Sequence, residues 1–374
     1  MTRVCSDPEG VIMKRFTGFE CGMGIGGWLT NYKRFNVLDE DQRWVLTVGD
    51  YEHFHSYITR RDIEYIASLG FDHIRLGFDQ IVLQDTDGTY REEIFEIIDD
   101  FILWCERSGL NIVLNLHKAM GNYCDIPEDV SLIDSNELQK SFIDFWLHFE
   151  KRFSHKPDIA FELLNEVRDV EPEKWNDLAK RTVNAIRELN RERKIIIGSV
   201  CWNNLNRIKD LCVLDDENVI YTFHMYDPSE FTHQRSVLQN KHCFYNRDMP
   251  YPGDIDRYKD FYKTVFGRDD AYEGYDVMDA KYMRDLLKPA KDFIDAHPDK
   301  ILWCGEFGTI RHAKLCWRMA WFKDVISFLK ENSIPYSVWN YLSTPNDGNR
   351  FSLVDDEERT ILSEELKNIL LGKF

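Results

Sequence analysis

Hydrophobic and polar positions along the chain form two alternating patterns. One pattern is a short apolar run rich in β-branched and aromatic residues, which predicts a buried strand. Eight such runs occur, at residues 17–24, 71–76, 111–116, 159–164, 194–198, 218–223, 300–304 and 334–339. The other pattern places apolar residues three and four positions apart, which predicts amphipathic helices. These helices are expected at 59–70, 91–109, 136–153, 173–190, 282–296, 315–332 and 361–372, with a short, poorly defined candidate at 204–213.

Strands that alternate with helices are typical of βαβ units and a parallel sheet. Eight repeats predict a (β/α)₈ TIM barrel within a single domain, residues 1–374. An open, doubly wound sheet is the alternative. It would need a glycine-rich turn that opens a helix, and GMGIGG at 22–27 leads into no clear helix. The barrel is therefore the favoured fold.

One connection is too long for an ordinary loop of such a barrel. Residues 227–280, rich in Tyr, Asp, Pro and Gly, separate the sixth strand from its helix. Loops of this length inside a compact domain usually carry structure of their own or a function. We expect an insertion, or small lid, within the barrel domain. A shorter polar stretch at 33–57 extends the first loop in the same way.

Composition narrows the possible partners. The formal net charge is −18, which argues against nucleic acid because phosphate binding needs a basic surface. No basic run suits a membrane surface, and no apolar run reaches the roughly 18 residues of a membrane span.

The nine cysteines are odd in number and form no C-x-x-C pair, so we expect reduced thiols rather than a metal site. The N-terminal residues do not resemble a signal peptide. We expect a cytoplasmic monomer, or a secreted one if a leader has been removed.

Polar residues stand where the predicted strands end. They are Arg75, His117, Asn165 with Glu166, His224 with Tyr226, Glu306 and Trp339. In TIM barrels the active site lies at these strand ends. Two glutamates on different strands suggest the carboxylate pair that glycoside hydrolysis requires. Arg75 and His224 can hold a carboxylate ionised, and the Trp339 ring offers a face on which a sugar stacks.

Several short segments together resemble family 5 of the glycoside hydrolases, the retaining cellulases and mannanases. They are FELLNE (161–166), WCGEFG (303–308), HMY (224–226), FDHIRLGFD (71–79) and VWN (338–340). Three further segments resemble the compact endoglucanases called cellulase C: FTHQ (231–234), YNRDMPYPG (245–253) and LKPA (287–290). The resemblance covers most of the chain. It implies that the 227–280 insertion closes one end of a sugar-binding cleft.

The resemblance also implies roles for individual residues. Glu166 matches the general acid/base and Glu306 the nucleophile, whereas Arg75, His117, Asn165, His224, Tyr226 and Trp339 match the supporting residues. Retaining enzymes hold their two carboxyl groups about 5–5.5 Å apart. Lys118 stands where many relatives carry a histidine and could change the polarity near the sugar, while Gly77 replaces the proline of RLPFD.

Three further residues are weaker candidates for sugar contact. Trp28 follows the first predicted strand and Trp202 the fifth, so either ring could stack on a sugar. Asn203, next to Trp202, could hydrogen-bond a hydroxyl.

The sequence thus predicts a retaining hydrolase of β-1,4 or mixed β-1,3/1,4 glucans that acts on oligo- or polysaccharide without metal or organic cofactor. Three alternatives stay open: a β-mannanase, an exo-acting β-glucosidase or β-1,3-glucosidase, and a glucan-binding barrel without activity.

Overall fold

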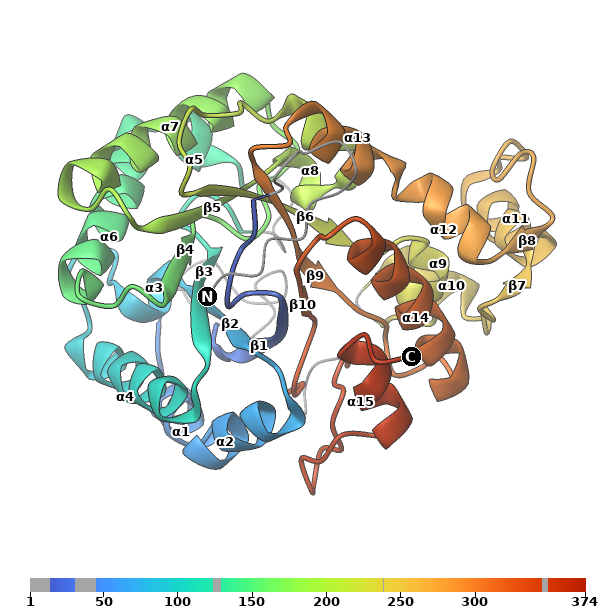
Figure 1. Cartoon of the computed structure of the whole chain (residues 1–374), viewed down its shortest axis with the longest axis horizontal. Coiled ribbons are helices and arrows are strands. Elements are labelled where there is room, and N and C mark those ends of the chain that lie inside the picture. Colours follow the sequence, from blue (N-terminus) through green and yellow to red (C-terminus); the bar gives the residue numbers. More distant parts are fainter. Residues whose placement is uncertain (1–13, 31–44, 124–128, 238, 345–348) are drawn as a thin grey trace.

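The computed structural model of the chain describes residues 14–30, 45–123, 129–237, 239–344 and 349–374. Within them, eight parallel strands close into a barrel in the order β1-β10-β9-β6-β5-β4-β3-β2. Helices surround the strands on all sides in Figure 1. The predicted (β/α)₈ barrel is therefore confirmed.

The barrel strands match the eight predicted apolar runs. Their bounds are β1 Cys21–Leu29, β2 His73–Asp79, β3 Asn111–Lys118, β4 Ile159–Glu162, β5 Lys194–Gly198, β6 Val219–Met225, β9 Ile301–Phe307 and β10 Tyr336–Val338. Several predicted bounds differ from the observed ones. The strand predicted at 17–24 begins at Cys21 and extends to Leu29, the strand predicted at 300–304 extends to Phe307, and the strand predicted at 159–164 ends at Glu162. Asn165 and Glu166 follow β4 in an irregular segment.

The predicted helices are present. Outside the 227–280 segment the helices are α1 Val48–Ser56, α2 Arg60–Leu69, α3 Gln80–Leu83, α4 Glu92–Ser108, α5 Ser131–Asp134, α6 Asn136–Phe153, α7 Pro172–Leu189, α8 Val200–Asn203, α12 Ala280–Leu286, α13 Lys288–Ala296, α14 Leu315–Glu331 and α15 Glu364–Leu370. Four shorter ones, α1, α3, α5 and α8, were not predicted. The predicted helix 282–296 is two helices, because Pro289 lies in the first turn of α13 and lacks the N–H that a continuous helix needs. The poorly defined candidate near 204–213 is the 3₁₀ helix Leu205–Asp210.

The inside of the barrel is apolar at its base and polar above. Side chains from the strands and from the segment before β1 form a closed apolar cluster: Phe16, Phe19, Val113, Ala160, Ile196, Ile220, Ile301 and Trp303. Nearer the carboxyl ends of the strands, the buried residues are polar or charged, among them Arg75, Asn115 and Glu162. The larger apolar core lies between strands and helices. Apolar side chains thus fill the amino-terminal end of the barrel interior, and polar and charged side chains occupy its carboxyl-terminal end.

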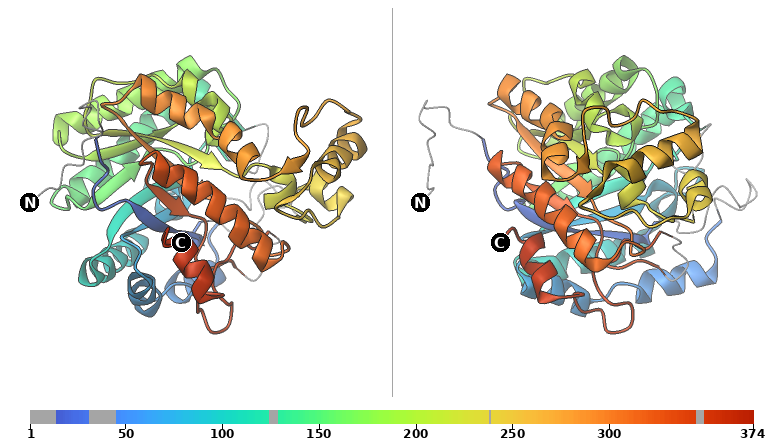
Figure 2. Two further views of the ribbon diagram at one scale, coloured as in Figure 1. Left: turned by 45° about the vertical axis from the view of Figure 1, so that its right-hand side comes forward. Right: turned by 90° about the vertical axis from the view of Figure 1, so that its right-hand side faces the viewer.

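The 227–280 segment holds a small group of elements. They are α9 Ser229–Thr232, α10 Asn240–Tyr245, α11 Ile255–Phe266 and the antiparallel pair β7 Gly253–Asp254 and β8 Val277–Met278. In Figures 1 and 2 these elements project from one side of the barrel, beside α12 and α14. A role as a lid stays a prediction. In the 33–57 stretch, α1 is helical, and residues 33–44 lie outside the described part of the chain.

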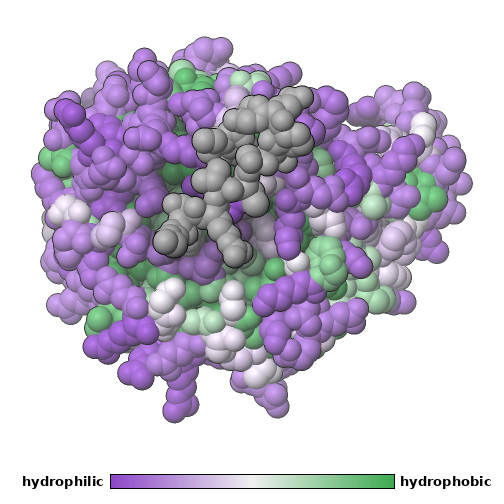
Figure 3. Space-filling model, viewed as in Figure 1, coloured by the Kyte–Doolittle hydropathy of each residue, from purple (hydrophilic) through white to green (hydrophobic). Residues whose placement is uncertain are grey.

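The outer surface agrees with the charged composition. Hydrophilic residues cover most of the face that Figure 3 shows, and apolar residues appear there in small groups. None of the helices in the described residues is long and apolar enough to cross a membrane.

A buried ion pair fastens α6 to the start of β5. Arg193 Nε donates to Glu150 Oε2 over 2.7 Å, and its other nitrogens donate to the carbonyl oxygens of Phe153, Lys156 and Ile159. Both side chains are buried. Replacing Arg193 by Met would leave the buried Glu150 carboxylate without a charged partner, with only the Asn190 amide still donating to it, so we expect a loss of about 3–5 kcal/mol in unfolding free energy.

Urea unfolding of Arg193→Met measures this loss. The double variant Arg193→Met, Glu150→Leu removes the stranded charge and should recover part of the stability. Equal stability of the single variant and the wild type would show that Arg193 does not stabilise the fold through Glu150.

Candidate active site

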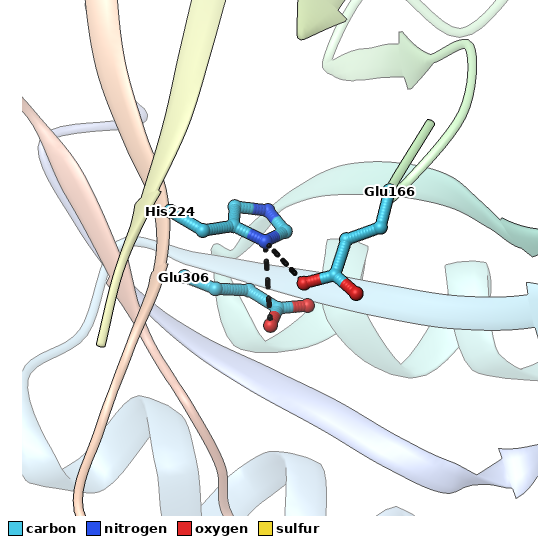
Figure 4. Close-up of side chains that lie close together, drawn as sticks. All are labelled: Glu166, His224 and Glu306. Carbon is cyan, nitrogen blue, oxygen red and sulfur yellow. Dashed lines mark hydrogen bonds and ion pairs between the residues drawn. The ribbon is translucent and has the colours of Figure 1, made fainter. Parts of the chain in front are cut away.

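Glu166, His224 and Glu306 converge at the carboxyl ends of the barrel strands. Figure 4 shows the imidazole of His224, on β6, pointing toward both carboxylates. Its Nδ1 lies 3.0 Å from Glu166 Oε1 and 3.8 Å from Glu306 Oε2. The sequence prediction that these residues meet at one site is consistent with this geometry.

An irregularity in β9 aims Glu306 into the site. Along β6 and β9, Phe223 pairs with Cys304, but the next residue, His224, pairs with Glu306. Gly305 is thus an extra residue in β9. A bulge of this kind turns the following side chain to the other face of a strand. It lets Glu306 point inward beside His224 rather than outward into the helix layer.

Glu306 has strong partners that favour its ionised form. Arg75 Nη1 donates to Oε1, and the Tyr226 hydroxyl donates to Oε2 over 2.8 Å. Burial alone would raise the pKa of Glu306, but the charge of Arg75, helped by His224, His117 and Tyr226, lowers the pKa to about 2. At neutral pH Glu306 is therefore a carboxylate held in a fixed orientation.

Arg75 is itself fixed by a residue that the sequence reading missed. Glu162, the last residue of β4, accepts from Arg75 Nε over 2.6 Å and from Nη2 over 2.8 Å. Asn165 Oδ1 accepts a further hydrogen bond from Nη2 over 2.6 Å. A charged residue inside the apolar run FELL was the available signal, because a buried charge needs a partner. Arg75 thus lies between two carboxylates and an amide.

Glu166 has a different environment. Its side chain is 19% exposed, and Oε1 faces His224 Nδ1. Burial raises the pKa of Glu166, and the nearby Glu306 adds to the rise, while His224 and Arg75 oppose it. The two glutamates therefore have pKa values shifted in opposite directions, the arrangement that a general acid and a nucleophile require.

The two carboxyl groups are close together. One oxygen from each, together with a ring nitrogen of His224, falls within a set of atoms that all lie within 4.8 Å of one another. Among the described residues, these three side chains form the group whose oxygen and nitrogen atoms are placed closely enough to bind a metal ion. However, the guanidinium of Arg75 already neutralises Glu306, which disfavours a second cation there.

Trp339 and His117 form one wall of the site. Their rings are parallel within 8°, with centroids 5.6 Å apart, and Trp339 is half-buried. The glycine-rich part of β1 makes room for the indole, because a Cβ on Gly26 would lie 2.2 Å from the Trp339 ring. Burial lowers the pKa of His117 to about 3, so this wall is uncharged.

The weaker candidates had different outcomes. Trp202 is 40% exposed and remains available for a ligand. The prediction for Trp28 was wrong: it is fully buried within β1, packs beside Trp104 and donates from Nε1 to the carbonyl of Phe54. The prediction for Asn203 was also wrong, because its side chain is buried beneath the site and donates to protein atoms.

Lys118 ends β3 opposite Asp79 of β2 and is buried. Its predicted influence on the sugar-binding cleft stays a prediction.

Comparison with known proteins identifies the family of this chain. The family model for cellulase (glycosyl hydrolase family 5) matches residues 38–344. Endoglucanase C of Acetivibrio thermocellus is 36% identical over 356 residues, which cover 94% of this chain and 98% of that protein. Cellodextrinase A of Ruminococcus flavefaciens is 29% identical, over 86% of this chain and 85% of that protein.

Solved structures agree on the fold. Endoglucanase Cel5A from the hyperthermophilic Thermotoga maritima gives a TM-score of 0.72 at 22% identity, covering 94% of this chain and 97% of that one. The extent of the sequence match carries the conclusion further: the chain belongs to glycosyl hydrolase family 5, the cellulase family, and is a glycoside hydrolase.

Proposed function

We propose that this enzyme cleaves β-1,4-linked glucans internally, with retention of configuration at the anomeric carbon. One observation carries the proposal: two carboxyl groups whose nearest oxygens are within 4.8 Å have pKa values shifted in opposite directions. Inverting enzymes leave room for a water molecule between carboxyl groups about 6.5–9.5 Å apart. The shorter separation favours direct attack by one carboxylate.

In the first step, the Glu306 carboxylate attacks C1 of the sugar. The bond between C1 and the glycosidic oxygen breaks, and the proton of Glu166 moves to that oxygen. Arg75 and Tyr226 hold Glu306 in position for attack, since each donates to a different oxygen. The product of this step is a covalent glycosyl-enzyme and a released sugar chain.

In the second step, Glu166 acts as a base. It takes a proton from water, whose oxygen attacks C1 and breaks the bond to Glu306. The His224 Nδ1 beside Glu166 Oε1 keeps the carboxyl group oriented in both steps. No group from outside the chain is needed, and every residue in these roles belongs to one chain, which is compatible with a monomer.

The choice of substrate is supported by the relatives. Endoglucanase C and endoglucanase C307, each 36% identical to this chain, are named for internal cleavage of glucan. The proposal extends that activity to this enzyme, with β-1,4 and mixed β-1,3/1,4 glucans as the expected substrates.

A product profile tests the proposal. Barley mixed-linkage glucan, carboxymethyl cellulose, mannan and cello-oligosaccharides are incubated with enzyme while viscosity and released sugars are followed. We expect a rapid fall in glucan viscosity, mixed oligosaccharide products and, by NMR, an initial β-anomer. Release of single sugars at constant viscosity would replace internal cleavage by exo action. An initial α-anomer would rule out retention.

Trp202 is the candidate platform for the leaving sugar. Its backbone N–H donates to the carbonyl of Val167 over 2.8 Å, which places it beside the residue that follows Glu166. The guanidinium of Arg168 lies 4.5 Å from the ring centroid. Trp202→Ala should raise the KM for glucan roughly fivefold with little change in kcat, since ring stacking contributes about 1 kcal/mol.

Phe244 provides the matched control for this prediction. It is 71% exposed on α10 of the insertion, so Phe244→Ala removes an exposed aromatic ring elsewhere and should leave KM unchanged. Equal KM values for Trp202→Ala and the wild type would remove Trp202 from the binding surface.

A further inference from the structure

Three consecutive residues after β5 adopt a left-handed backbone. Cys201, Trp202 and Asn203 have φ values of 56°, 60° and 53°. Non-glycine residues occur there rarely, because their Cβ atoms are crowded in this conformation. Such strain persists where the surroundings enforce it, often at functional sites. The turn is held by hydrogen bonds from the N–H groups of Cys201 and Trp202 to the carbonyls of Arg168 and Val167, of 3.1 and 2.8 Å.

The turn drives the Asn203 side chain into the barrel. Asn203 is fully buried, and its amide covers the backbone of Gly198 at the end of β5. A Cβ on Gly198 would lie 1.9 Å from Asn203 Oδ1, so the position of the amide depends on glycine there. The strained turn and the glycine together bring one amide group under the site.

The Asn203 amide nitrogen has two acceptors. Nδ2 lies 2.5 Å from the carbonyl oxygen of Asn165 and 3.3 Å from His224 Nε2. The reversed amide would set two oxygens against each other at 2.5 Å, so the nitrogen must face Asn165. Oδ1 is buried and has no hydrogen-bond partner among the described residues. The Asn203 amide is therefore positioned by the two contacts of its Nδ2 group, while its Oδ1 receives no hydrogen bond from the described residues.

This contact determines where His224 carries its proton. A nitrogen that accepts a hydrogen bond cannot also carry a proton toward the donor, so Nε2 is the unprotonated nitrogen of a neutral ring. The proton is then on Nδ1, which lies 3.0 Å from Glu166 Oε1 and donates to it. Asn203 thus influences Glu166 through His224, although its buried side chain is not placed to contact the substrate.

We propose that Asn203 is a positioning residue that holds His224 in the neutral, Nδ1-protonated form and so keeps a positive charge away from Glu166. This inference rests on the proposed role of Glu166 as acid and base. An imidazolium would lie against Glu166 and within 3.8 Å of Glu306, and it would favour the ionised form of Glu166, which cannot protonate the leaving oxygen.

Other charged and titratable groups also face His224 and Glu166, from β2, β3 and β9 and from the residue after β6. They are Arg75, His117, Tyr226 and Glu306. None of them contacts His224 Nε2 in the hydrogen bonds of the described residues, so Asn203 is the side chain that acts on that nitrogen.

Asn203→Asp tests the proposal through the pH profile. A carboxylate that turns away from the Asn165 carbonyl oxygen can accept a hydrogen bond from a protonated Nε2, and its negative charge favours the imidazolium. The alkaline limb of the kcat/KM profile should then move to lower pH by about one unit, while KM for a cello-oligosaccharide stays within about twofold. Asn204→Asp is the matched control: Asn204 Oδ1 caps the next turn by accepting from Asn206 N–H, which aspartate also does. A limb that stays in place or moves to higher pH in Asn203→Asp overturns the proposal.

Ring nitrogen NMR of the wild-type enzyme tests the same inference without a variant at Asn203. With ¹⁵N-labelled histidine, and with the His224 signals assigned by their loss in His224→Gln, we expect a protonated Nδ1 and an unprotonated Nε2 at neutral pH. A protonated Nε2 would overturn the assignment. Because this readout needs no turnover, it stays valid even if the product profile refutes the proposed glucanase activity.

Discussion

Glu306→Gln should abolish hydrolysis of glucan while the protein stays folded and keeps its affinity for the substrate. Loss of an attacking group lowers kcat on the order of 10⁴–10⁶-fold in enzymes that form covalent intermediates. Glutamine is nearly isosteric and can still accept from Tyr226, which donates to Glu306 Oε2. It cannot attack C1, because a neutral amide is a poor nucleophile. Initial rates on mixed-linkage glucan, together with calorimetric titration of a cello-oligosaccharide, measure both quantities.

Glu230→Gln is the matched control for this experiment. Glu230 is also a buried glutamate, but it lies on α9 of the insertion and accepts from the Tyr272 hydroxyl over 2.6 Å. Its replacement should leave activity in place. If Glu306→Gln kept more than about one hundredth of the wild-type rate, Glu306 would not be the nucleophile.

Glu166→Gln should give a defect that depends on the leaving group. General acid catalysis contributes about 10²–10⁴-fold, so cleavage of glucan should slow by that factor. A dinitrophenyl cellobioside needs no proton on its leaving oxygen. Its first step should remain fast, followed by slow release of the glycosyl-enzyme, which a burst of dinitrophenol reveals. An equal loss on both substrates would contradict an acid/base role for Glu166.

The pH profile should change in the same variant. Activity requires ionised Glu306 and protonated Glu166. In the wild type, kcat/KM should therefore fall on the acid side as pH approaches the lowered pKa of Glu306, about 2. It should fall on the alkaline side as pH passes the raised pKa of Glu166. Glutamine at position 166 does not titrate, so the alkaline limb should disappear.

The sequence predicted much of this architecture because strands buried on both faces are continuously apolar. The runs at 194–198 and 300–304 are examples. It predicted the positions of Glu166 and Glu306 because parallel strands end at one edge of the barrel. It placed Trp28 wrongly because the glycines of β1 interrupt the apolar pattern, so the strand was expected to end before Trp28 instead of after it.

Two residues of the site were not predicted in their observed positions for a different reason. Glu162 lies within an apolar run, and its partner Arg75 is 87 residues away in the chain. Asn203 is buried by a left-handed turn that no local pattern encodes. Both positions depend on contacts between distant strands, which no local periodicity records.

The Arg75 cluster has a consequence for inhibition. One guanidinium faces the two carboxylates of Glu162 and Glu306, so this group of three side chains carries one excess negative charge. The transition state of glycoside cleavage resembles an oxocarbenium ion. A cyclic amine that is protonated where the sugar has its anomeric carbon would place a cation beside Glu306, and such compounds should bind this enzyme far more tightly than the neutral sugars they imitate.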